Sequence, residues 1–216
     1  TPASGNPSIT LTWTTNDPDG AGPCSSVSST AILTVNDPAS AVVNGPYTGC
    51  SNVPVNLSAT TNTAGTWTTT GSGSFTNAGT ATTTYQPGPT DGGTTFTITW
   101  TTTDPDGAGP CQPASATANV TITVAATANA GGPYVTCGVA PVSINAVSSG
   151  AGQWSAPAGS FADANSTTTT FTPTSAQLGT TVNLTWTTND PDGIGPCTAV
   201  TSIASVTVNP LPTASV

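Results

Sequence analysis

Apolar residues alternate with polar ones in short runs along this chain, which is the period of a β-strand. Phe96, Ile98 and Trp100, for example, are separated by single threonines, and threonine is itself β-branched and favours strands. We find no run with the period of an amphipathic helix. The pattern therefore predicts an all-β protein built from short, half-buried strands.

The strand pattern is repeated along the chain. Residues 11–24, 98–111 and 184–197 are nearly identical, and their tryptophans are 87 and 86 residues apart. The Gly-Pro-Tyr triplet at 45–47 returns at 132–134 with the same spacing. This period is too long for one turn of a solenoid and suits a small β-sandwich.

We therefore expect an elongated rod of tandem Ig-like β-sandwich modules. Complete modules are expected at residues 39–125 and 126–212. Residues 1–38 would be strands F and G of a preceding module, and 213–216 would begin the next one. The tryptophans assigned to the module cores are Trp13, Trp67, Trp100, Trp154 and Trp186.

Finer expectations concern single positions in the first complete module. An apolar alternation from Val53 to Ala59 predicts strand B, and one that ends at Val124 predicts strand G. Asn44 and Gly131 precede the two Gly-Pro-Tyr triplets, and both residue types tolerate a positive φ. We therefore expect a sharp bend at each of these two positions.

The charge composition excludes several classes of function. The chain has no Lys, Arg or His, and its 9 acidic residues are all Asp, which gives a net charge of −9. Ser-His-Asp and Cys-His catalytic sites and a basic nucleic-acid surface all lack their residues. The negative charge also repels nucleic acid and acidic membranes, and no apolar run is long enough for membrane insertion. We expect no enzymatic activity, no nucleic-acid partner and no cofactor other than calcium.

Calcium binding is considered because an Asp-Pro-Asp-Gly loop occurs three times. Paired carboxylates followed by glycine suit Ca²⁺, which binds clustered oxygens. The same residues are typical of a turn in which Asp accepts backbone hydrogen bonds, and the sequence leaves both interpretations open. The six candidate calcium ligands are Asp17, Asp19, Asp104, Asp106, Asp190 and Asp192.

The order of these motifs resembles a known repeat type. A Gly-Pro-Tyr triplet, a cysteine, Gly-x-Trp, Gly-x-Phe and Leu/Ile-Thr-Trp-Thr-x-x-Asp-Pro follow one another in both modules. They resemble the PKD-like and Ig-like repeats of giant secreted surface proteins of Bacteroidota, which are adhesins or gliding-type fibres exported by type IX secretion. The resemblance implies a secreted, extracellular or cell-surface location.

The five cysteines fit an oxidising compartment. In an Ig-like sandwich, Cys50 in the A–B turn and Cys111 in the F–G loop lie at opposite ends of one module, about 20 Å apart. A disulfide needs Cα atoms within about 7 Å, so we expect Cys50 to bond Cys197 of the next module instead. Cys24 and Cys111 would reach back to earlier modules and Cys137 forward to a later one. If the topology is not Ig-like, the alternative pairs are Cys50–Cys111 and Cys137–Cys197.

These observations favour the structural shaft of an extracellular fibre or adhesin, whose partners are adjacent modules or neighbouring fibre subunits. The alternatives are an array that binds glycans or surfaces through its threonine-rich faces, and the non-catalytic tail of a secreted enzyme. Residues 1–38 cannot complete a core alone. We expect polypeptide outside the chain to complete it, either as an upstream continuation or as strands from a neighbouring copy.

Overall fold

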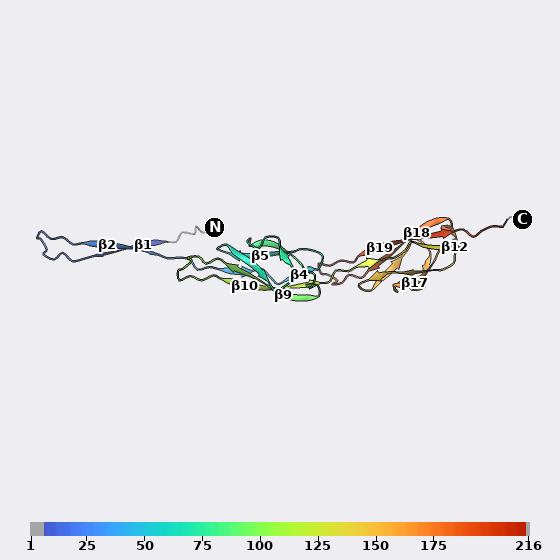
Figure 1. Ribbon diagram of the computed structural model, residues 1–216, viewed down its shortest axis with the longest axis horizontal. Coiled ribbons are helices and arrows are strands. Elements are labelled where there is room, and N and C mark those ends of the chain that lie inside the picture. The colour runs from blue at the N-terminus through green and yellow to red at the C-terminus, as the bar shows by residue number, and fades with distance from the viewer. Residues whose placement is uncertain (1–6, 215–216) are drawn as a thin grey trace.

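The computed structural model describes residues 7–214 and shows a rod with three parts in line. A long two-stranded hairpin is followed by two β-sandwich modules, coloured green and orange in Figure 1. Within the described part of the chain, no helix has the length and apolarity needed to cross a membrane. The architecture is that of tandem Ig-like modules, as the strand pattern predicted.

The first module consists of two four-stranded sheets, in the orders β4-β10-β9-β6 and β3-β5-β8-β7. β4 runs parallel to β10, and the other pairs are antiparallel. The strands are β3 (Ala41–Val43), β4 (Tyr47–Cys50), β5 (Val55–Thr61), β6 (Gly65–Thr69), β7 (Ser74–Phe75), β8 (Thr82–Gln86), β9 (Thr94–Thr102) and β10 (Ser115–Thr123).

The second module repeats this plan with small changes. Its larger sheet has the order β12-β19-β18-β15, and the opposite face is formed by β13-β17-β16 and the short pair β11-β14. The elements are β11 (Ala128–Asn129), β12 (Tyr134–Cys137), β13 (Val142–Asn145), β14 (Val147–Ser148), β15 (Gly152–Ser155), β16 (Ser160–Phe161), β17 (Thr168–Thr172), η1 (Ser175–Gln177), β18 (Thr180–Thr188) and β19 (Thr201–Asn209).

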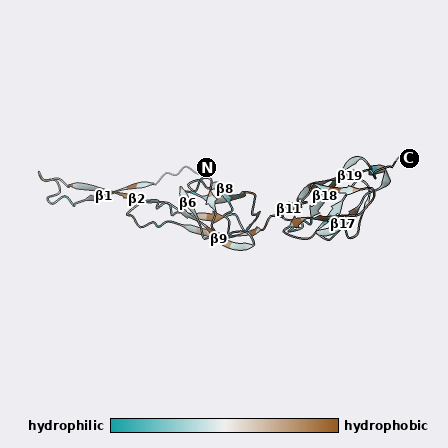
Figure 2. Ribbon diagram, turned by 45° about the vertical axis from the view of Figure 1, so that its right-hand side comes forward, coloured by the Kyte–Doolittle hydropathy of each residue, from teal (hydrophilic) through white to brown (hydrophobic). Residues whose placement is uncertain are grey.

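Each module has one core, filled by the inward positions of its alternating strands. In the first module Trp67 and Trp100 face each other across β6 and β9, with ring centroids 5.2 Å apart. Trp154 and Trp186 repeat this contact at 5.5 Å in the second module. In Figure 2 the brown parts of the ribbon mark hydrophobic residues along the strands of both sandwiches. The four tryptophans are buried, as predicted.

The fifth tryptophan lies on an uncovered face, in line with the expectation that residues 1–38 cannot complete a core alone. Trp13 lies on β1 (Ser8–Thr14), which pairs only with β2 (Ser28–Thr34), and its side chain is 76% exposed. Nothing within residues 7–214 covers the apolar face of this hairpin in the way that the second sheet covers the complete modules. Residues 1–6 and 215–216, which the expected module boundaries include, lie outside the described part of the chain.

Three single-residue expectations are wrong. Val53 precedes β5 and Val124 follows β10, and both side chains are exposed because the chain has already left the sandwich at these points. Asn44 does not adopt a positive φ, whereas Gly131 does, at +70°. The Asn44 side-chain amide instead donates a hydrogen bond to the Ser58 hydroxyl on the neighbouring strand β5.

Candidate functional site: the junction between modules

A disulfide between Cys50 and Cys197 joins the two complete modules. The two Cα atoms are 5.1 Å apart, and the residues are separated by 147 positions in the sequence. Both cysteines are almost fully buried. The pairing expected from Ig-like topology is therefore confirmed. The alternative pairs do not form, since Cys111 and Cys137 are free thiols, as is Cys24.

Strand geometry brings these cysteines together. Cys50 ends β4, which runs parallel to β10 and therefore finishes at the end of the module where β10 also ends. Cys197 closes the loop between β18 and β19 of the second module, which extends back toward the first. Its sulfur lies 3.7 Å from the carbonyl oxygen of Thr123, the last residue of β10.

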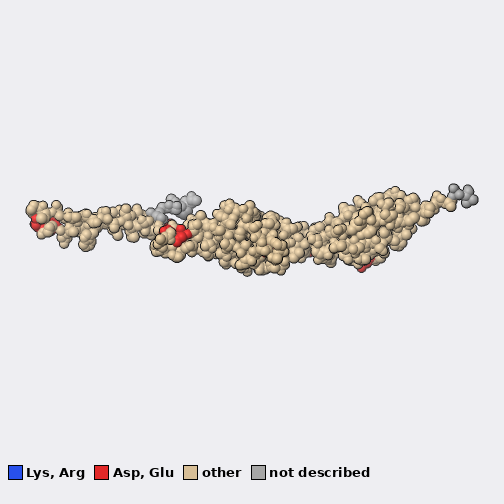
Figure 3. Space-filling model, viewed as in Figure 1, with Lys and Arg blue, Asp and Glu red and all other residues tan. Residues whose placement is uncertain are grey.

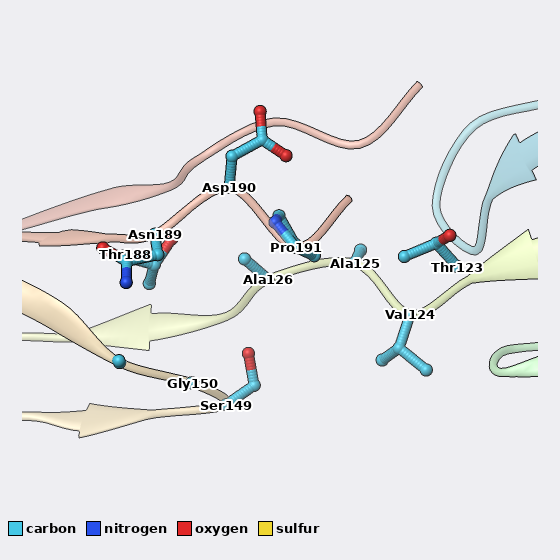
Figure 4. A pocket seen from close by; sticks show the side chains of 11 residues that line it. Thr123, Val124, Ala125, Ala126, Ser149, Gly150, Thr188, Asn189, Asp190 and Pro191 are labelled. Carbon is cyan, nitrogen blue, oxygen red and sulfur yellow. The ribbon is translucent and has the colours of Figure 1, made fainter. Parts of the chain in front are cut away.

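The chain crosses the same junction through a short linker at residues 124–127. At its start the Ala125 N–H donates to the Ser51 hydroxyl, at 3.0 Å. Beside the linker is an open hollow of about 410 Å³, lined by both modules. In Figure 4, Ala125 and Ala126 lie between Thr123 on one side and Thr188 on the other. The lining has no cluster of polar groups directed at one point, so we assign it no ligand.

The Asp-Pro-Asp-Gly loop of the second module is the second feature of the junction. In the loop of the second module, the N–H groups of Asp192 and Gly193 donate to Asp190 Oδ1 at 3.1 Å each. Asp192 Oδ2 accepts the N–H of Cys197 at 3.1 Å and so holds the disulfide cysteine in place. The Asp104–Asp106 loop repeats all three bonds, and the Asp17–Asp19 loop repeats two of them.

A glycine makes room for the second carboxylate in every loop. A Cβ atom added to Gly195 would clash with the Asp192 carboxylate, and the equivalent glycines in the other loops meet the same obstacle. Among residues 7–214 no group of three or more His, Cys, Asp or Glu is placed to hold a metal ion. One oxygen of each of the six carboxylates accepts backbone N–H groups, as in the turn interpretation. These contacts do not test the calcium interpretation.

The loop of the first module meets the hairpin in the same way. Asn36, just after β2, donates from its side-chain amide to Asp106 Oδ2 at 3.2 Å. Figure 3 shows acidic side chains gathered at the hairpin tip and beside this contact. Burial and the nearby Asp106 carboxylate raise the pKa of the Cys111 thiol. Burial alone would raise the pKa of Asp106, but hydrogen bonds from Cys111 and Asn36 outweigh it and lower that pKa.

Sequence reasoning missed one buried carboxylate. Asp91 is 2% exposed and accepts hydrogen bonds from the Tyr85 hydroxyl, the Gly88 N–H, and both the N–H and hydroxyl of Ser72. Burial opposes its charge, yet these donors hold the pKa of Asp91 below its ordinary value. The signal was present in the repeat, because Asp91 and Tyr85 are replaced together by Gln177 and Phe171 in the second module.

Comparison with solved structures shows the fold. The insect immune protein hemolin aligns with 91% of this chain and 62% of its own, with a TM-score of 0.51 and 12% sequence identity. Drosophila OTK extracellular domains 3–5 align with 86% of this chain and 66% of their own, with a TM-score of 0.37 and 12% identity. Mouse cadherin-23 EC22–24 aligns with 94% of this chain and 74% of its own, at 0.33 and 14%. This chain thus spans less than two thirds of hemolin.

No protein-family profile matches the sequence, and no curated protein sequence matches it either. At these identities the structural likeness shows the Ig-like fold alone. Any functional conclusion therefore has to come from the geometry of the junction.

Proposed function

We propose that this chain is part of the structural shaft of an extracellular fibre or cell-surface adhesin. The observation that carries the proposal is the Cys50–Cys197 disulfide, which covalently connects consecutive modules rather than stapling one module internally. A disulfide inside each sandwich would strengthen that module alone. A bond across the junction fixes how one module follows the next, which is useful to a protein that must keep its length and direction.

The position of the bond also determines how the chain carries tension. A pull on the two ends passes along residues 7–50, across the disulfide, and then along 197–214. The 146 residues between the cysteines lie outside this covalent path and bear no tension, as follows from a sequence separation of 147. They include β5 to β18, which hold most of both cores. Stretching therefore cannot extend the greater part of either sandwich while the disulfide is intact.

The proposed location is secreted, extracellular or cell-surface. Disulfides of this kind persist in oxidising compartments, and the absence of Lys and Arg leaves trypsin-like proteases no cleavage site. The resemblance to repeats of giant Bacteroidota surface proteins supports export by type IX secretion as part of the same proposal. The proposed role is mechanical and not enzymatic, and adjacent modules or fibre subunits are the partners.

Single-molecule stretching from both termini tests the shaft. A fully extended chain spans at most about 3.3–3.6 Å per residue, so the disulfide should withhold roughly 500 Å of extension in the oxidised protein. Reduction should release this length. The Cys50→Ser, Cys197→Ser double variant should release it without reductant, and a Cys24→Ser variant, which leaves the junction intact, should not.

The proposal fails if the oxidised protein already releases the full contour length at low force, because an intact bond cannot release that length and Cys50 and Cys197 are then not bonded. A glycan or surface-binding array is the alternative function. Specific retention on glycans or on a surface by the isolated chain, lost on substitution of threonines on the outer strand faces, would favour that alternative.

A further inference from the structure

The β1–β2 hairpin exposes an apolar face whose counterparts are buried elsewhere in the chain. Leu11 and Trp13 are more than half exposed, whereas their equivalents Ile98 and Trp100 are buried in the first module. The same contrast holds for Ile9, Leu33 and Val35 against Phe96, Val120 and Ile122. The hairpin therefore has the residues of a core face without the rest of the core.

This face is already arranged as in a complete module. Ile9 pairs with Leu33 in the register in which Phe96 pairs with Val120. After the strand, the Thr15 N–H donates to the Val27 carbonyl at 2.9 Å, and Thr102 repeats this bond to Ala114 at 2.9 Å. The Thr15 hydroxyl accepts the Val27 N–H in return, again as in the complete module. A partner would thus meet a preformed surface.

The complete modules show what covers such a face. In the first module the cover is the segment of residues 39–93, which supplies β3 to β8. Trp67 and Phe75 from this segment form the aromatic cluster around Trp100, and Leu57 and Tyr85 complete the core. β4 and β6 also pair with the two outer edges of the β10–β9 pair. The corresponding edges of β2 and β1 have no strand partner within residues 7–214.

The Cys111 thiol points to the same partner independently. Its sulfur lies 3.9 Å from the carbonyl oxygen of Asn36, as the Cys197 sulfur lies 3.7 Å from that of Thr123. Asn36 and Thr123 are equivalent positions of the repeat, one just after β2 and the other at the end of β10. At the complete junction the partner of Cys197 is Cys50, which belongs to the covering segment. Cys111 thus occupies the position of a junction cysteine whose partner residue is not among 7–214.

We propose that the hairpin is a docking surface for one occupant: a half-module of this same repeat, equivalent to residues 39–93, whose turn cysteine forms a disulfide with Cys111. The half-module would bury the apolar face and pair with both free edges. The two thiols would lose two protons and two electrons to a disulfide oxidant such as oxidised glutathione, which becomes two glutathione thiols. The proposal goes beyond the shaft function, because it names the partner and the surface that receives it.

The test supplies the half-module as a probe. Residues 37–93 of this chain, with Trp67→Phe to remove their own tryptophan, are mixed with the full chain in a glutathione redox buffer. We expect a one-to-one adduct in which peptide mapping by a non-tryptic protease links probe Cys50 to Cys111. Since the other four tryptophans of the chain are buried, acrylamide quenching reports on Trp13, and its quenchable fraction should be lost.

Matched variants separate docking from the covalent bond. A probe with Cys50→Ser should still protect Trp13 but form no adduct. The full chain with Leu11→Asn should lose both effects while keeping its Cys50–Cys197 disulfide, which is remote from the hairpin. The stretching experiment depends only on that remote disulfide, so the two proposals can fail separately.

A second experiment uses a fusion protein and so does not depend on the solubility of the isolated probe. Residues 37–93 are joined directly before Pro7, so that the half-module and the hairpin belong to one polypeptide. Protection of Trp13 and a bond from Cys111 to the added cysteine are expected. If Trp13 stays quenchable and Cys111 stays free in this fusion, the proposal is wrong. It is also wrong if the chain alone dimerises with Trp13 protected and Cys111 still free, because the hairpin of a second copy is then the occupant.

Discussion

At the residue scale, close packing around the paired tryptophans depends on one small residue. Gly65 begins β6 next to Trp100, and Gly152 occupies the equivalent place beside Trp186. A Cβ atom on Gly65 would lie 2.6 Å from the Thr101 carbonyl oxygen and 2.7 Å from the Trp100 ring. The Gly-x-Trp motif of the repeat therefore reflects a steric requirement in which the glycine lets the strand approach the indole.

Gly65→Ala should destabilise the first module by about 1–3 kcal/mol, the usual cost of overpacking a core. Denaturant unfolding followed by core tryptophan fluorescence measures the change. Gly79→Ala is the matched control, because its nearest atom to a new Cβ is 3.5 Å away. Equal stability of the two variants would show that the strand shifts to accept the methyl group at no cost.

Asp91 makes the first module sensitive to acid. Its pKa in the folded protein lies below the ordinary 3.8, so the unfolded chain binds a proton more readily than the native one in acid. The stabilisation is present above pH 4 and is lost as the pH falls through the lowered pKa. Burial and the Asp91 hydrogen bond raise the pKa of Tyr85 to about 12, so stability should also fall between pH 10 and 12.

Asp91→Asn should remove the acid-dependent part of this stability and cost about 1–3 kcal/mol at neutral pH, since hydrogen bonds to a charged group are lost. Thermal melts of the first module from pH 2 to 7 measure both effects. The second module is an internal control, because Gln177 and Phe171 replace the titrating pair. A similar loss of stability in both modules between pH 4 and 2 would assign the acid sensitivity to other carboxylates.

At the scale of elements, the sequence was most informative where burial alternates strictly. β9 and β18 carry three inward apolar residues each, and both strands were predicted at their correct places. The repeat also placed Cys50 and Cys197 at the ends that face each other, because strand topology alone decides this. Burial of Trp13 could not be judged in the same way, since the residue pattern of β1 equals that of β9. The two strands differ only in whether a second sheet packs against them, and the hairpin sequence does not determine this.

The Asp-Pro-Asp-Gly loops lead to a prediction about calcium. Because Asp190 and Asp192 already accept backbone N–H groups, a chelator should leave the melting temperature unchanged. Removing the second carboxylate of the loop should lower the melting temperature more than the chelator does. Asp192→Ala deprives the Cys197 N–H of its acceptor and should cost about 1–3 kcal/mol at the junction. Calorimetry with and without chelator measures both.

A fall in the melting temperature on chelation would contradict this expectation. Abolition of that fall by the Asp104→Ala, Asp106→Ala double variant would establish the calcium interpretation, because a bound ion stabilises the folded state by mass action.

At the scale of the whole molecule, the rod has one short linker and one disulfide at the junction of its complete modules. Modules joined by a small interface ordinarily move relative to each other. Here the linker at residues 124–127 and the buried Cys50–Cys197 bond connect the modules at two separate points of the sequence. Two attachments remove bending freedom that a single linker would leave, and so the direction of one module follows from that of its neighbour.

Opening this disulfide should therefore loosen the rod without unfolding it. Small-angle X-ray scattering of the Cys50→Ser, Cys197→Ser variant should give a broader pair-distance distribution than that of the oxidised parent. The circular dichroism spectra of the two proteins should be the same. Each core lies within its own module and does not include residues of the other, so both sandwiches should survive. A Cys24→Ser, Cys111→Ser, Cys137→Ser variant, which removes only the free thiols, should scatter like the parent. Identical curves for the opened and the intact junction would mean that the linker and the contacts around Ser51 hold the modules by themselves, and the disulfide would then protect against tension rather than bending.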